Sequence, residues 1–369
     1  MGKDQFLCRA GADIVNGAGE KVYLRGVSFG NEVWTTDGIP VTHHDEEDFK
    51  RLRGLGMNAV RFYLNYKTFE KEDLPYQYQD QAWDWLDQNV AWAGEHEVYL
   101  ILNMHLSQGG FQAHGEGHAL WNEDSNQDRL SALWKAIAER YKDEPYVAGY
   151  GLLNEPVPDR AVEQWRVLAQ RLAHDIRTVD KNHLLFVERC INVQSQNHDE
   201  ENFNFPMVSD DKVVYEFHIY QPYVYTHQLL EWAGGEDGGT YPDDGQYHYL
   251  NEAKGYDNSS AIAFKRNKAY LRAVIERYVN WAKSRQVPVY MGEFGTCGPS
   301  YRNGKGGLEW MGDILDLAHE HQLHYTYHAY HGYDEDDYGI YHGAESLPDE
   351  ARANQPLIDL FRNRLVAEN

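Results

Sequence analysis

Two glutamates stand where buried segments of the chain stop. The apolar run 150–153 leads directly into Asn154 and Glu155, and the largely apolar run 287–292 leads into Glu293. Burying an ionised carboxylate without a partner is costly, so these groups need each other, a cation or a ligand. Two carboxyl groups facing one cavity suit cleavage of a glycosidic bond, where one donates a proton and the other acts as nucleophile or base.

Polar groups recur at the ends of other apolar runs. They are Arg61, His105, His218, Tyr220, Tyr327 and His328. Each alone has an ordinary explanation, such as a core histidine, a tyrosine at a rim or a structural ion pair. Together they suit a site: donors such as Arg61 and Tyr220 would keep Glu293 charged, and a drier position would raise the pKa of Glu155. Spacing alone leaves the roles of the two glutamates open.

Eight short apolar or β-branched runs alternate with helical patterns. The runs cover residues 22–29, 58–64, 98–104, 147–153, 183–188, 213–220, 287–294 and 324–330. Between two of them, Leu130, Leu133, Trp134 and Ile137 follow helical spacing, and we expect Ser125 to cap that helix. Strands alternating with helices indicate parallel pairing with right-handed crossovers.

This alternation predicts an α/β protein, a (β/α)₈ TIM barrel that forms a single domain over residues 1–369. A doubly wound open sheet is the alternative, but no GxGxxG motif follows the first run. In a barrel the active-site groups sit at the C-terminal ends of the strands. The fold would therefore gather the polar groups named above at one rim.

The motifs resemble glycoside hydrolase family 5, within clan A of retaining (β/α)₈ β-glycosidases. The matching segments are LRGVSFG at 24–30, NAVRFY at 58–63, LILNMH at 100–105, the segment 139–156 ending in LLNEP, EFHIYQPY at 216–223 and VYMGEFG at 289–295. They follow the family's order over nearly the whole chain. The resemblance implies double displacement with Glu155 as acid/base and Glu293 as nucleophile, about 5–5.5 Å apart, and no metal or cofactor.

The resemblance also implies supporting roles around the scissile bond. Asn154 would hydrogen-bond the sugar 2-hydroxyl, and Arg61 and Tyr220 would orient and ionise the nucleophile. His105 and His218 would line the subsite where the bond breaks.

One position departs from the family pattern. His328 aligns with a tryptophan that usually forms the floor under the sugar. We expect His328, or its neighbours Tyr327 or Tyr330, to stack on the substrate instead. This departure bears on the substrate subclass rather than on the two glutamates.

Aromatic residues make up 14% of the chain, which suits a site that stacks sugars. Trp34 follows the first run and Trp121 follows the third, and both are candidate sugar platforms; the alternative is that either anchors the core. A long insertion at about 221–262 carries several tyrosines and Trp232. We expect it to form one wall of the cleft, with a packed loop as the alternative.

The formal net charge of −24, without a Lys/Arg-rich stretch, argues against nucleic acid and anionic membranes as partners. No run approaches the roughly 18 apolar residues of a membrane span. We expect a monomer whose partner is a β-linked oligo- or polysaccharide. The N-terminus lacks the apolar core of a signal peptide. We expect a secreted or periplasmic protein whose signal peptide is absent from this sequence, and a cytoplasmic location is the alternative.

These observations favour a retaining β-glycosidase that acts on β-glucan, most specifically an endo-β-1,4-glucanase. The alternatives within this class are an endo-β-mannanase, a mixed-linkage glucanase and an exo-acting β-glucosidase. A non-catalytic carbohydrate-binding barrel is the alternative from another class. It is disfavoured because both glutamates and their supporting residues occur together.

Overall fold

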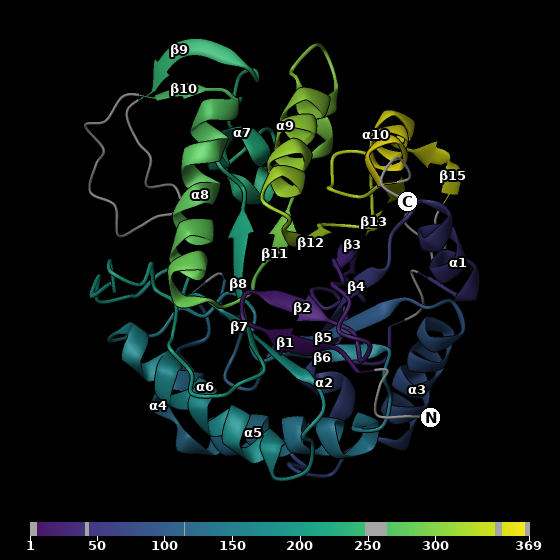
Figure 1. Ribbon diagram of the computed structural model, residues 1–369, viewed down its shortest axis with the longest axis vertical. Helices are drawn as coiled ribbons and strands as arrows, with labels where there is room; N and C mark the ends of the chain where they lie inside the picture. Colours follow the sequence, from purple (N-terminus) through teal and green to yellow (C-terminus); the bar gives the residue numbers. More distant parts are fainter. Residues whose placement is uncertain (1–5, 41–43, 114, 248–263, 344–348, 366–369) are drawn as a thin grey trace.

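Eight parallel strands close into a barrel at the centre of the molecule (Figure 1). The computed structural model describes residues 6–40, 44–113, 115–247, 264–343 and 349–365. The barrel strands are β3 Arg25–Phe29, β4 Ala59–Asn65, β5 Tyr99–Leu106, β6 Val147–Gly151, β7 Leu184–Glu188, β8 Val213–Ile219, β11 Val289–Phe294 and β12 His324–Tyr327. Each falls within or beside a predicted run, so the (β/α)₈ barrel is confirmed.

Helices surround the barrel and follow its strands (Figure 1). They are α1 Glu46–Gly54, α2 Tyr66–Phe69, α3 Asp80–Glu95, α4 His118–Asn122, α5 Asp124–Tyr141, α6 Val162–Arg177, α7 Tyr223–Thr226, α8 Lys268–Arg285, α9 Gly307–Glu320 and α10 Gln355–Leu365. Within the described residues, none of them is long and apolar enough to cross a membrane.

The start of α5 corrects one prediction. Its N-cap is Glu123, which makes no side-chain capping hydrogen bond, and Ser125 lies inside the first turn. The prediction that Ser125 caps this helix was wrong. Because α4 ends at Asn122, only one residue separates the two helices, and α5 starts before Ser125.

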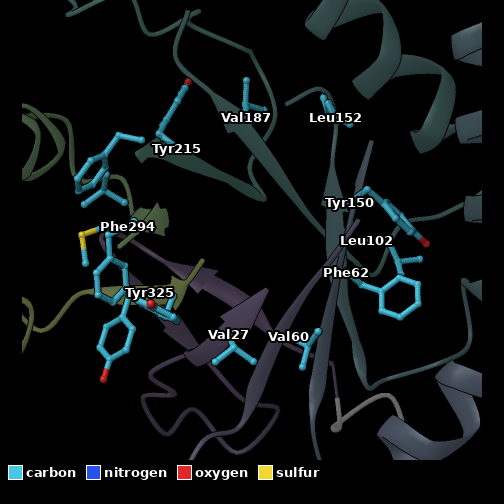
Figure 2. Packing of buried hydrophobic residues seen from close by; sticks show 14 of the residues in the cluster. Val27, Val60, Phe62, Leu102, Tyr150, Leu152, Val187, Tyr215, Phe294 and Tyr325 are labelled. Carbon is cyan, nitrogen blue, oxygen red and sulfur yellow. The ribbon is translucent and has the colours of Figure 1, made fainter. Parts of the chain in front are cut away.

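The outer face of the barrel forms the main hydrophobic core. Because side chains alternate along a strand, Val60 and Phe62 of β4 point outward with Val27 and Leu102 of the neighbouring strands (Figure 2). All four are 0% exposed and belong to one cluster with the helices. The residues between them point into the barrel.

The barrel interior has two layers of opposite character. Its lower layer is apolar, with Ile101, Phe186, Val214 and Tyr290 in one cluster. The hairpin of β1 (Cys8–Ala10) and β2 (Asp13–Val15) contributes Ile14 to that cluster and so closes this end of the barrel. The upper layer is polar, because the inward positions near the C-terminal ends of the strands carry arginine, histidine and glutamate.

The predicted insertion at 221–262 contains α7, the 3₁₀ helix η2 (Glu231–Ala233) and strand β9 (Asp243–Tyr247), which pairs with β10 (Phe264–Arg266) beside α8 (Figure 1). Residues 248–263, including Tyr249 and Tyr256, lie outside the described residues. A three-stranded sheet of β13 (His331–Gly332), β14 (Tyr341–His342) and β15 (Asp349–Ala353) follows the last barrel strand.

Close contact between β3 and β4 predicts a stability effect at Gly26. A Cβ atom there would lie 1.7 Å from the Ala59 carbonyl oxygen, so Gly26→Ala must push the two strands apart. We expect the free energy of unfolding to fall by about 1–3 kcal/mol, measured by urea denaturation followed by tryptophan fluorescence.

Gly312→Ala is the matched control, because no atom lies within 4 Å of its added Cβ in α9. It should stabilise the protein by about 0.5–1 kcal/mol. A Gly26→Ala variant as stable as the wild type would contradict the contact between these strands.

Candidate active site

Glu293 reaches the barrel interior through an irregularity in β11. The pairing of β11 with β8 shifts register between Met291 and Glu293, so Met291 stays in the outer core while Glu293 turns inward. Gly292 lies at the shift, and a Cβ atom there would come within 1.9 Å of Glu216 Oε1. A side chain at position 292 would therefore displace the Glu216 carboxyl, and the glycine lets Glu216 and Glu293 occupy the same rim.

Three side chains donate hydrogen bonds to the Glu293 carboxylate. Arg61 Nη1 and the Tyr63 hydroxyl each lie 2.6 Å from Oε1, and the Tyr220 hydroxyl lies 2.8 Å from Oε2. Burial by itself would raise the pKa of this carboxyl, but the positive charges of His218 and Arg61 outweigh it and hold the pKa well below its usual range. Glu293 is therefore ionised at neutral pH.

Arg61 has no exposed surface and joins three of the other rim groups. Its Nη1 donates to Glu293, its Nη2 donates to Asn154 Oδ1 at 2.9 Å, and its Nε lies 2.8 Å from Glu216 Oε1. Its pKa is raised well above the usual value: burial opposes the charge, but the charge of Glu216 and neighbouring groups prevails. The guanidinium therefore stays charged inside the barrel.

Glu155 follows the end of β6 and lies at the edge of the cavity, with 18% of its side chain exposed. Its backbone adopts a positive φ of 46°. Its N–H donates to Glu188 Oε2 at 2.8 Å, and its Oε1 lies 2.9 Å from His218 Nδ1. One oxygen of Glu155 is therefore engaged by the histidine, and the other can face a ligand.

His218 connects the two candidate catalytic carboxyls. Its Nδ1 lies 2.9 Å from Glu155 Oε1 and 3.7 Å from Glu293 Oε2, and its Nε2 lies 3.3 Å from Glu216 Oε1. Burial opposes its charge, but the surrounding glutamates raise its pKa well above the usual value. His218 is therefore an imidazolium that donates from both ring nitrogens.

His105 contributes a neutral ring beside the nucleophile. It stacks on Tyr63 with ring centroids 3.9 Å apart, and burial lowers its pKa well below the usual value. The Tyr63 hydroxyl also lies 3.0 Å from His328 Nδ1. Because the single phenolic hydrogen goes to Glu293, His328 Nδ1 is the donor in that contact.

A cavity of about 1020 Å³ lies over these groups. Its exposed aromatic walls are Trp34 after β3 and Tyr223 and Trp232 after β8, with 48%, 41% and 61% exposed surface. The cavity also takes in His328 and Glu155. Flat apolar faces above a charged floor are suited to sugars, which carry both apolar and hydroxyl surfaces.

The structure brings most predicted residues to one rim. Those that contact each other or line the cavity are Arg61, His105, Asn154, Glu155, His218, Tyr220, Glu293, His328 and Trp34. Asn154 is 1% exposed and accepts from Arg61, so it lies behind the cavity surface.

Trp121 is the exception and corrects a prediction. It is 4% exposed, its indole N–H donates to Gln112 Oε1 at 2.9 Å, and its ring packs edge-on to Trp165. It is absent from the residues that line the cavity. Trp121 is a core anchor because α4 folds its apolar face onto the helices, so the prediction of a sugar platform there was wrong.

The alternatives to His328 are also resolved by burial. Tyr327 and Tyr330 are 0% and 1% exposed, and their hydroxyls bind Tyr338 O and Asp48 Oδ1, respectively. Neither lines the cavity, whereas His328 does.

Sequence reasoning missed three residues of this rim: Tyr63, Glu188 and Glu216. Tyr63 lies two positions after Arg61, and Glu216 two positions before His218, so the two-residue period of a strand places each on the same inward face as its partner. Glu188 is the last residue of β7. The same rule of strand ends that selected the other glutamates would have found it.

Among the described residues, one group beside the cavity could hold a metal ion, because its ligand atoms all lie within 4.8 Å of each other. The group consists of Glu155, Glu188 and His218. These atoms contact each other directly: His218 Nδ1 lies 2.9 Å from Glu155 Oε1 and 3.4 Å from Glu188 Oε1. Hydrogen bonds and charge pairing therefore account for this cluster.

Comparison with known proteins identifies the family. Residues 15–334 match the family model of cellulase, glycosyl hydrolase family 5. Endoglucanase C of Acetivibrio thermocellus is 25% identical over 356 residues, 93% of this chain and 98% of that protein. Cellodextrinase A of Ruminococcus flavefaciens is 22% identical over 279 residues, 75% of this chain and 76% of that protein.

Solved structures share the fold. An endoglucanase from the hyperthermophile Thermotoga maritima has a TM-score of 0.67 and 20% identity, covering 91% of this chain and 96% of that one. A second structure, described as a glycoside hydrolase, has a TM-score of 0.72 and 21% identity, covering 93% and 99%. The chain belongs to the cellulase family, glycoside hydrolase family 5, and is a glycoside hydrolase.

Proposed function

We propose that the protein is a retaining endo-β-1,4-glucanase. The observation that carries this proposal is the pair Glu155 and Glu293 on one cavity, with Glu293 ionised by three donors and Glu155 at the cavity edge. In the first step Glu293 attacks the anomeric carbon while Glu155 protonates the leaving oxygen. In the second step Glu155 removes a proton from water, which then displaces Glu293.

The position of His218 supports retention rather than inversion. Its Nδ1 lies within 2.9 Å of one Glu155 oxygen and 3.7 Å of one Glu293 oxygen, so those two oxygens cannot be farther apart than both distances combined. This upper bound admits the roughly 5–5.5 Å spacing of retaining enzymes and excludes all but the lower end of the roughly 6.5–9.5 Å range that an inverting enzyme needs for its water.

The aromatic walls support action on a chain of sugars. Trp34 lies after β3, and Tyr223 and Trp232 lie after β8, three strands away around the barrel. Glu155 follows β6 and Glu293 belongs to β11, so the two carboxylates come from opposite sides of the line that joins the platforms after β3 and β8. Platforms on two sides of the scissile bond are what an endo-acting enzyme requires, and the volume of about 1020 Å³ exceeds that of most small-ligand pockets.

The proposal predicts the products released from polysaccharides. Soluble β-1,4-glucan should lose viscosity well before most of its reducing ends are released, because internal bonds are cut first. The assay compares viscosity and reducing ends on β-1,4-glucan, mixed-linkage β-glucan and β-mannan. Faster cleavage of mannan, or release of single glucose units without loss of viscosity, would select one of the alternatives; no cleavage of any β-glycan would contradict the proposal.

The low pKa of Glu293 predicts how two tyrosine variants respond to pH. Tyr63→Phe and Tyr220→Phe each remove one donor to the ionised carboxylate, so each raises the pKa of Glu293. The acid limb of kcat/KM on an activated aryl β-cellobioside should therefore move up by about one pH unit. The variants lose activity at a pH where the wild-type nucleophile is still ionised.

Tyr150→Phe is the control for these variants. Tyr150 is buried like Tyr63, but its hydroxyl donates to Asp180 and not to Glu293. Its acid limb should coincide with that of the wild type. An unchanged limb in both Tyr63→Phe and Tyr220→Phe would show that these hydrogen bonds do not set the ionisation of the nucleophile.

A further inference from the structure

Glu188 lies beside Glu155 and has no part in the two steps above. It is the last residue of β7 and is 1% exposed. Its main-chain carbonyl accepts the indole N–H of Trp165 at 2.7 Å, which fixes the end of the strand against α6. A buried carboxyl at the rim of the site is unfavourable unless its contacts compensate, so its contacts indicate what it does.

The main contact of Glu188 is with a strained part of the backbone. Glu155 has a φ of 46°, in the left-handed region that few residues other than glycine adopt, and the following Pro156 favours an extended residue before it. Such a conformation persists only where the surroundings hold it. The N–H of Glu155 donates to Glu188 Oε2 at 2.8 Å, so the carboxyl of Glu188 holds this amide in place.

The charged groups that face Glu188 come from three other elements. Arg61 Nη2 on β4 lies 3.7 Å from its Oε2, His218 Nδ1 on β8 lies 3.4 Å from its Oε1, and the carboxyl groups of Glu216 and Glu155 also lie nearby. Burial raises the pKa of Glu188 well above its usual value, and the positive charges of His218 and Arg61 oppose that rise. What Glu188 offers the Glu155 N–H is an acceptor oxygen, Oε2, held 2.8 Å from the amide nitrogen.

We propose that Glu188 is a positioning residue for Glu155, which holds the Glu155 backbone so that its carboxyl can protonate the leaving sugar oxygen. The inference rests on the proposed role of Glu155 as the acid/base. Glu188 and Glu155 both lie within reach of His218 Nδ1, so the end of β7, the loop after β6 and the histidine on β8 form one support for the acid.

Three substitutions separate the place of the oxygen from its charge. Glu188→Gln keeps an acceptor oxygen at the same position. Glu188→Asp keeps the carboxyl but withdraws it by about 1.5 Å, one bond length. Glu188→Leu removes the acceptor and keeps most of the volume, so it repeats the test of Glu188→Asp by an independent change.

The experiment measures kcat/KM on two aryl β-cellobiosides, one with a good and one with a poor leaving group, since only the poor one needs acid help. For Glu188→Gln we expect values within about threefold of the wild type on both substrates. For Glu188→Asp and Glu188→Leu, the poor substrate should lose about tenfold or more relative to the good one, part of the roughly 10²–10⁴-fold that general acids contribute.

Two controls make the result specific. Glu155→Ala should show the same dependence on the leaving group, and more strongly; if it slows both substrates equally, the proposed role of Glu155 fails. Asp180→Asn alters a buried carboxyl at the opposite end of β7, where Asp180 Oδ2 lies 2.5 Å from His183 Nδ1. It should lower thermal stability without changing the ratio between the substrates.

The inference on Glu188 is overturned if Glu155→Ala responds as expected but Glu188→Asp and Glu188→Leu keep the wild-type ratio. It is also overturned if Glu188→Gln changes the ratio as much as Glu188→Asp, because charge and not position would then be the property that matters.

Discussion

The buried guanidinium of Arg61 is the interaction on which the rest of the site depends. It has no exposed surface, so its charge must be balanced inside the barrel, and Glu293 and Glu216 provide that balance. In return the arginine keeps Glu293 ionised and orients Asn154. Removing any one partner leaves a charge buried without compensation. The fold can carry this group because the strand ends converge on it from several directions.

The two layers of the barrel interior separate stability from chemistry. Below, Ile101 and Phe186 pack with the N-terminal hairpin as an ordinary apolar core. Above, His218 lies between Glu155 and Glu293, whose protonation states must differ in the proposed reaction. Glu293 has three donors and stays charged, whereas Glu155 lies at the cavity edge with one oxygen bound to the histidine. Environment, and not residue type, distinguishes two identical side chains.

The sequence was enough to predict the barrel, because eight runs with strand character alternate with helical patterns. Two of these runs end at Glu155 and Glu293, and the structure brings both glutamates to one cavity. It could not separate a platform from a core anchor: Trp34 and Trp121 both follow a strand, and only packing shows that the second is buried. Glu188 was overlooked although it also ends a run. Its contact with a main-chain amide depends on a backbone angle that no residue pattern reveals.

The central claim, that Glu293 attacks the sugar while Glu155 supplies the proton, is tested most directly by trapping the intermediate. A 2-deoxy-2-fluoro β-cellobioside with a good leaving group should form an ester that hydrolyses slowly, because the fluorine destabilises the transition state of both steps. Mass spectrometry of the digested protein should then find one added sugar unit on the peptide that carries Glu293. An ester on Glu155, or turnover with inversion and no ester, would contradict the account.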